Sequence, residues 1–140
     1  MRRSPHDNGR NLRLLLDSHT LLWAIYSPDR LSNRVSLLLQ DEANELVVSH
    51  ATLWELLNKI GRGKLLLAGT SVNDVVERVM ALGVTLFPIE LNHMLLSSSL
   101  PHHHSDPFDR MIIAQAMEEN LPVLTSDAQF SAYDIEIIWQ

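Results

Sequence analysis

The sequence predicts an α/β protein built on a parallel sheet, and two observations support this class. Short apolar runs of strand length alternate with longer segments whose apolar residues recur at helical spacing. This alternation is typical of strand–helix–strand units, in which successive strands run parallel. The chain has 140 residues, of which 46% are hydrophobic and 20% charged, so it can bury a core of ordinary size.

The first half of the chain supplies two strands and three helices. Residues 1–11 are polar, and we expect a flexible arm ahead of a single domain over residues 12–140. Pro28 stops the first helix, and Ser49 is a suitable N-cap for the third. The predicted elements are a strand over 12–16, helices over 20–26 and 31–40, a strand over 45–48 and a helix over 50–60.

The second half continues the alternation. Ser71 and Asp74 form a capping-box-like start, with Asp in place of the usual Glu. Asp106 is a suitable N-cap, and Pro107 suits the first position of the helix that follows. The predicted elements are a helix over 71–82, a strand over 84–87, a helix over 90–98, a loop over 101–105, a helix over 106–120, a strand over 123–125 and a short strand over 136–138.

Composition excludes several classes of protein. There is no cysteine, so disulfides and cysteine-based zinc sites are absent, which fits a reducing compartment such as the cytoplasm. Asp17 and His19 interrupt the first apolar stretch, which predicts neither a signal peptide nor a membrane span. The formal net charge of −6 argues against a basic protein that coats nucleic acid, although an acidic metal site is compatible with phosphate binding.

Four acidic residues lie where elements end or begin. Asp17 and Asp127 follow predicted strands, whereas Glu55 and Asp109 lie in the first turns of predicted helices. In a parallel sheet, strand carboxyl ends and helix N-termini gather on one edge, where ligands bind. Carboxylates converging there repel each other unless a cation neutralises them, and oxygen ligands suit Mg²⁺ or Mn²⁺. The sequence therefore predicts a divalent-metal site suited to phosphate chemistry.

Three of these acids also have a purely structural explanation. Asp17 fits a solvated strand end, and Asp127 fits the cap of a turn over residues 127–129. Asp109 falls near the third position of its helix, where a negative charge favours the helix dipole. Asp109 also shares a face with Ile112 and Ala116, however, and this placement favours a carboxylate directed at the sheet edge.

Glu55 is the acid with the best structural alternative. It can form an exposed pair with Lys59, four residues further along the helix. In that arrangement Trp54, Leu57 and Ile60 form the buried stripe. Read by itself, this pattern favours a structural role for Glu55.

Histidines and tryptophans complete the candidates. The run 102–104 contains three adjacent histidines, which cannot easily converge on one ion, so we expect a loop rather than a metal site. The tryptophans fall on apolar faces, which predicts core positions rather than surfaces for base stacking. They are Trp23, Trp54 and Trp139.

Four motifs in this order resemble PIN-domain proteins, in particular VapC-type toxins. The motifs are residues 14–23, residues 48–55 with Lys59 and 63–65, residues 106–116, and residues 124–127 with 137–139. The resemblance implies a PIN-like three-layer α/β/α sandwich with a mostly parallel sheet of four or five strands. It also implies that the metal-binding and catalytic residues are Asp17, Glu55, Asp109 and Asp127. One departure is Ser105, where similar sequences often carry a basic residue.

The resemblance implies an activity and partners. The activity is that of a Mg²⁺- or Mn²⁺-dependent endoribonuclease, the toxin of a toxin–antitoxin pair, with a small cognate antitoxin and a homodimeric state. Basic residues near the acids are candidates to guide the RNA backbone. They are Lys59, Arg62, Lys64 and Arg110. The apolar stretches 65–67 and 94–96 suit either a partner surface or the core.

Two alternatives from other classes stay open. An aspartate-dependent phosphatase also places an acid after its first strand, but such enzymes commonly carry a second acid two residues on, where this chain has His19. A non-catalytic interaction module needs none of the four acids and binds no divalent ion.

Overall fold

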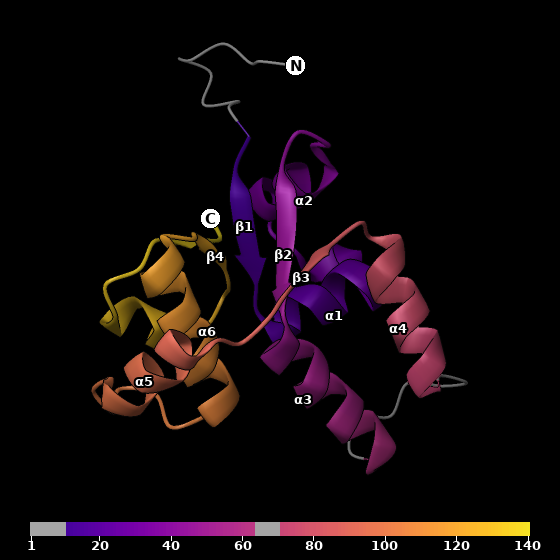
Figure 1. Ribbon diagram of the computed structural model, residues 1–140. Helices are drawn as coiled ribbons and strands as arrows, with labels where there is room; N and C mark the ends of the chain where they lie inside the picture. Colours follow the sequence, from indigo (N-terminus) through magenta and orange to yellow (C-terminus); the bar gives the residue numbers. More distant parts are fainter. Residues whose placement is uncertain (1–10, 64–70) are drawn as a thin grey trace.

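The centre of the protein is a five-stranded parallel sheet with the strand order β3-β2-β1-β4-β5 (Figure 1). The computed structural model describes residues 11–63 and 71–140. The strands are β1 (Arg13–Leu16), β2 (Glu45–Ser49), β3 (Thr85–Phe87), β4 (Val123–Leu124) and β5 (Ile137–Ile138). The predicted α/β class and parallel sheet are confirmed. The predicted arm lies outside the described residues except for Asn11.

In the described residues, six α-helices and two short 3₁₀ helices connect the strands. The α-helices are α1 (Ser18–Tyr26), α2 (Asn33–Gln40), α3 (His50–Gly61), α4 (Val72–Ala81), α5 (Leu91–Ser99) and α6 (Pro107–Glu119). The 3₁₀ helices are η2 (Pro28–Arg30) and η3 (Ala128–Ala132). Within residues 11–63 and 71–140, no helix has both the length and the apolar character needed to cross a bilayer.

Side-chain caps set the helix starts. The Ser49 hydroxyl accepts the Ala51 N–H, and Ser71 and Asp74 form a reciprocal capping box, as predicted. Helix α2 starts two residues later than predicted because Ser32 is its N-cap and accepts the N–H of Val35 at 3.1 Å. These caps fix the residue at which each of the three helices begins.

Both faces of the sheet are covered, so the protein has three layers. Successive strand residues point to opposite faces. In β1, Leu14 and Leu16 belong to one core cluster, with residues of α1, α2, α3 and α4. Leu15 belongs to the second cluster, together with residues of α6. Figure 1 shows α5 and α6 on one side of the sheet and α4 on the other. The implied α/β/α sandwich is confirmed.

The strand order decides which residues meet at the carboxyl edge. Strand β1 lies between β2 and β4, so the segments that follow these three strands are neighbours. The Asp17 N–H donates to the Leu124 carbonyl at 3.4 Å, and the Thr20 hydroxyl donates to the same carbonyl at 2.8 Å. The start of α1 is therefore joined to the end of β4, where the predicted acids gather.

Candidate functional site at the carboxyl edge of the sheet

Asp17 is buried at the end of β1, with 3% of its surface exposed. Its Oδ1 accepts the Thr20 N–H at 3.0 Å and caps α1. Its Oδ2 accepts the Thr125 hydroxyl at 2.6 Å. Asp17 is thus not a solvated strand end, because both carboxylate oxygens are held by neighbouring segments.

Asp127 caps a turn, as its structural explanation predicted, and its second carboxylate oxygen contacts His104. Its Oδ1 accepts the Gln129 N–H at 2.9 Å and caps η3. Its Oδ2 lies 3.1 Å from Nε2 of His104. One oxygen therefore holds the turn while the other faces the neighbouring acid site.

Asp109 has the most perturbed ionisation in the described part of the chain. Burial raises its pKa from 3.8 to about 7, and the charge of Asp106 adds to the rise. His104 acts in the opposite direction, with its Nε2 at 3.1 Å from Asp109 Oδ2. Glu55 and Asp17 raise the pKa of Asp109 further. The carboxylate after β1 and the one on α3 therefore both act electrostatically on Asp109 in α6.

Glu55 is buried, with 4% of its surface exposed, although it does form the predicted ion pair. Lys59 Nζ lies 2.9 Å from Glu55 Oε2. The helix is rotated relative to the predicted exposed pair, because Glu55 faces inward and Trp54 is 62% exposed. The core position expected for Trp54 is wrong, whereas Leu57 and Ile60 do pack against the core.

Trp54 and Phe108 form an aromatic contact between α3 and α6. Their ring centroids lie 5.6 Å apart with an interplanar angle of 75°, an edge-to-face arrangement. Each ring is next in sequence to a predicted acid, Glu55 or Asp109. Trp23 and Trp139 are half-buried and contact each other, with centroids 5.8 Å apart.

His104 is the site residue that the sequence analysis missed. It is 7% exposed, and its Nε2 lies between the Oδ2 atoms of Asp109 and Asp127. The other two histidines of the run, His102 and His103, are exposed. Its place two residues before an Asp-Pro helix start was the available signal, because that spacing puts a side chain beside the first turn of the helix.

Arg110 was predicted to contact RNA, but its side chain is buried and bound within the protein. It is 7% exposed, and its terminal nitrogens donate to four main-chain carbonyls. The acceptors are Ser97, Leu100, Pro101 and His104, at 2.8 to 3.3 Å. The guanidinium therefore ties the end of α5 and the α5–α6 connection to α6, and both of its terminal nitrogens are already engaged by main-chain carbonyls.

The remaining basic candidates differ in their surroundings. Arg62 is exposed at the C-cap of α3, and Lys59 is partly engaged by Glu55. Lys64 and the stretch 65–67 lie outside the described residues. In the second predicted apolar stretch, Met94 and Leu95 are exposed and Leu96 is half-buried.

The structure gathers the predicted acids with one unforeseen partner. In the described ranges 11–63 and 71–140, His104, Asp109 and Asp127 bring one ligand atom each within 4.8 Å of one another. Asp17 and Glu55 are outside this tight group, although their charges act on Asp109. Oxygen-rich, negatively charged surroundings of this kind suit a hard divalent cation. Fold and site together define an α/β protein with an acidic centre at the carboxyl edge of its sheet.

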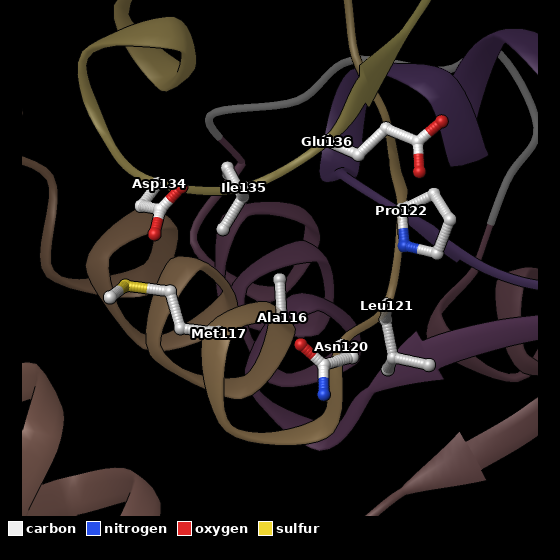
Figure 2. A pocket seen from close by; sticks show the side chains of 8 residues that line it. All are labelled: Ala116, Met117, Asn120, Leu121, Pro122, Asp134, Ile135 and Glu136. Atoms are coloured by element: carbon white, nitrogen blue, oxygen red, sulfur yellow. The ribbon is translucent and has the colours of Figure 1, made fainter.

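The pocket in Figure 2 lies at the opposite edge of the sheet. It has a volume of about 230 Å³, and Leu121 and Pro122, which precede β4, help to line it. Asp134 and Glu136, which precede β5, line it as well (Figure 2). None of the predicted site acids is among its lining residues. The chemistry of the carboxyl edge therefore does not extend to this pocket.

Comparison with known proteins gives the family. The sequence model of the PIN-domain family matches residues 14–136 of this chain. A curated relative, Ribonuclease VapC22 of Mycobacterium tuberculosis, is 30% identical over 123 residues, which cover 86% of this chain and 91% of the relative. The chain belongs to the PIN-domain family, among its VapC-type members, and this confirms the predicted resemblance.

Solved structures share the fold at low sequence identity. VapBC2 from Rickettsia felis, bound to a DNA fragment from its promoter, has a TM-score of 0.69 and 16% identity, covering 92% of this chain and 100% of that one. VapC20 of Mycobacterium tuberculosis, a sarcin–ricin loop cleaving toxin, has a TM-score of 0.61 and 11% identity, covering 91% and 99%. The three-layer arrangement is thus that of known VapC proteins.

Proposed function

We propose that this protein is a divalent-metal-dependent endoribonuclease and the toxin of a toxin–antitoxin pair. The observation that carries the proposal is the convergence of carboxylates on Asp109, whose pKa is raised to about 7 by burial and by neighbouring acids. A cation at this position relieves that repulsion. The relative VapC22 is named a ribonuclease, which supports RNA as the substrate.

The proposed ligands of the ion are the four acids Asp17, Glu55, Asp109 and Asp127. Their donor atoms are carboxylate oxygens, which suit Mg²⁺ or Mn²⁺. When bound, such an ion lowers the pKa of a water molecule and neutralises charge on the scissile phosphate. Hydrolysis of the phosphodiester by an attacking water would leave a 5′-phosphate and a 3′-hydroxyl.

The protein side chains hold this centre in place. Asp17 is fixed by hydrogen bonds from Thr20 and Thr125, so little reorganisation is needed when a ligand binds. Glu55 is assigned the role of holding or deprotonating the attacking water. Asp109 has to lose its proton before it binds a cation, because its pKa is about 7.

The position of Asp17 argues against the phosphatase alternative. A nucleophilic aspartate needs an oxygen that can approach phosphorus. Both oxygens of Asp17 accept hydrogen bonds inside the protein, and the residue is 3% exposed. A fixed, buried carboxylate is better suited to a ligand role.

Partners follow from the family and from the surface. VapBC complexes are among the similar structures, which supports a small antitoxin as partner. On α5, Leu91 is 67%, Met94 47% and Leu95 62% exposed, and this apolar face supports a homodimer contact. We assign Lys59 and Arg62 to the RNA backbone, with Lys64 kept from the sequence as a third candidate.

Cleavage of labelled, structured RNAs tests the proposal. The purified protein is assayed with Mg²⁺, with Mn²⁺ and with EDTA, beside an Asp17→Asn variant. We expect cutting that requires the metal and is lost in the variant. A protein that cuts no RNA and binds no divalent ion by calorimetry would instead be an interaction module.

A further inference from the structure

In the loop between α5 and α6, His104 is held through its backbone N–H, its carbonyl and its ring. His104 is 7% exposed, and its backbone N–H donates to the Tyr133 hydroxyl at 2.9 Å. Its carbonyl accepts from Arg110 Nη1 at 3.3 Å. The ring packs edge-to-face on Phe130, with centroids 5.6 Å apart. The position of this imidazole is therefore set by both neighbouring main-chain groups and by the core.

The orientation of the His104 ring follows from its two nitrogens. Nδ1 accepts the backbone N–H of Asp106 at 3.2 Å. Nε2 lies 3.1 Å from Oδ2 of Asp109 and 3.1 Å from Oδ2 of Asp127. Turning the ring over would replace both nitrogens by carbons and lose every one of these contacts. The observed orientation is the one that satisfies all three neighbours.

These contacts determine which nitrogen carries the proton. Nδ1 accepts the Asp106 N–H, so it must carry a lone pair. In the neutral ring the proton is therefore on Nε2. Nε2–H then donates toward two carboxylate oxygens. To bind a metal ion, Nε2 would need a lone pair. The proton would then be on Nδ1, where it would clash with the Asp106 N–H. Proximity to the acids alone therefore does not make His104 a ligand.

We propose that His104 is a positioning residue whose Nε2–H holds Asp109 and Asp127 together and is not a ligand of the ion. The inference about metal affinity rests on the proposed function, whereas the position of the proton does not. The two acids come from different elements, α6 and the N-cap of η3. Along the chain, these elements are connected only through β4. A shared donor lowers the cost of keeping their charges close together.

Two variants separate the donor from the rest of the ring. In His104→Gln the amide nitrogen reaches the place of Nε2 and restores a donor to the acids. In His104→Asn the shorter side chain reaches only the place of Nδ1. Both variants lose the imidazole and its ring contact with Phe130, although the side chain of Asn is one methylene shorter than that of Gln. Circular dichroism and thermal melting of each confirm that it is folded.

Nitrogen-15 NMR of the histidine rings tests the proton position in the metal-free protein. The chain has seven histidines, and the signals missing from His104→Gln identify His104. At a pH where the ring is neutral, we expect its proton on Nε2, and we expect the proton to stay there when Mg²⁺ is added. A proton on Nδ1, or loss of the Nε2 proton on addition of Mg²⁺, would overturn the proposal and make His104 a ligand.

Calorimetry with Mg²⁺ and Mn²⁺ tests the positioning role. We expect His104→Gln to bind close to wild type and His104→Asn to bind about 10- to 100-fold more weakly, the usual cost of losing an outer partner of metal ligands. Equal losses in both variants would overturn the donor role. A wild-type protein that binds neither ion would refute the proposed function, while the NMR result still decides the position of the proton.

Discussion

The Thr125 hydroxyl donates to Oδ2 of Asp17 at 2.6 Å and joins residues that lie 108 positions apart in the chain. The same Oγ1 accepts the Asp127 N–H at 3.0 Å. A single buried side chain thus connects the acid after β1 with the acid after β4. The hydrogen bonds of Thr125 are therefore part of the geometry of the site as well as of the fold.

Replacing this hydroxyl should weaken both stability and metal binding. In Thr125→Val the methyl groups keep the volume, but Asp17 loses a donor and the Asp127 N–H loses an acceptor. We expect a loss of about 1–3 kcal/mol in the free energy of unfolding. Urea denaturation measures this loss, and calorimetry measures metal affinity. Thr125→Ser keeps the hydroxyl and should bind the ion nearly as well as wild type; equal binding by both variants would contradict the role assigned to the hydroxyl.

The metal-free protein should lose stability as the pH rises from about 4 to about 7. The folded pKa of Asp109 is raised from 3.8 to about 7, so in this window the folded state binds a proton that the unfolded state lacks. The free energy of unfolding therefore falls with rising pH, by at most about 4 kcal/mol from this group. Urea denaturation in EDTA across this range measures the slope.

Asp109→Asn provides the control for this pH dependence. The amide cannot ionise, so the contribution of Asp109 to the slope should disappear. Above pH 7 the variant should be more stable than wild type in EDTA, because the buried charge is gone. Addition of Mg²⁺ should stabilise wild type and leave this variant nearly unchanged. An unaltered slope in the variant would assign the pH dependence to other groups.

Asp17→Asn should abolish RNA cleavage while the fold is kept. Asparagine is also a good N-cap, so its amide oxygen can still accept the Thr20 N–H. The ion loses a charged ligand, and we expect activity to fall by at least about 100-fold. Cleavage assays beside circular dichroism separate activity from folding. Full activity in a folded variant would remove Asp17 from the centre.

Arg110 should be required for stability, in contrast to Arg62. In Arg110→Gln several of the carbonyls of the α5–α6 connection lose a charged donor in a buried place, which should cost about 3–5 kcal/mol. Arg62→Gln changes an exposed side chain and should leave stability within about 0.5 kcal/mol. If Arg62 contacts a phosphate, its variant should also bind RNA with a weaker salt dependence. The slope of log K against log salt concentration should be smaller by about 1. Thermal melting and salt titrations of RNA binding give the two measurements.

Trp54→Ala should cost little stability for so large a residue. The side chain is 62% exposed, so we expect a loss of about 1 kcal/mol, against about 2–5 kcal/mol for Leu56→Ala, whose side chain is 1% exposed. Chemical denaturation of the two neighbouring variants measures the difference. Equal losses would mean that Trp54 is covered in solution, as in a homodimer, and sedimentation of each variant would then reveal the change in assembly.

The sequence by itself determined the parallel α/β class, most element boundaries and the position of the acids at element ends. Local signals were sufficient for these, because strand runs, helical periodicity and N-caps such as Ser49 and Asp106 act over a few residues. The acids were found because strand ends and helix starts share one edge in any parallel sheet.

Only the tertiary structure decided which side chains face one another. Helix α3 turns Glu55 inward and Trp54 outward, because the face that packs on the sheet depends on the crossing of α3 with its neighbours. Arg110 has a charge that suggested RNA, yet the nearby carbonyls of the α5–α6 connection bind it. His104 joins the site only because a turn directs its ring between two acids distant in sequence. Such contacts depend on the relative placement of whole elements, which short-range sequence patterns do not predict.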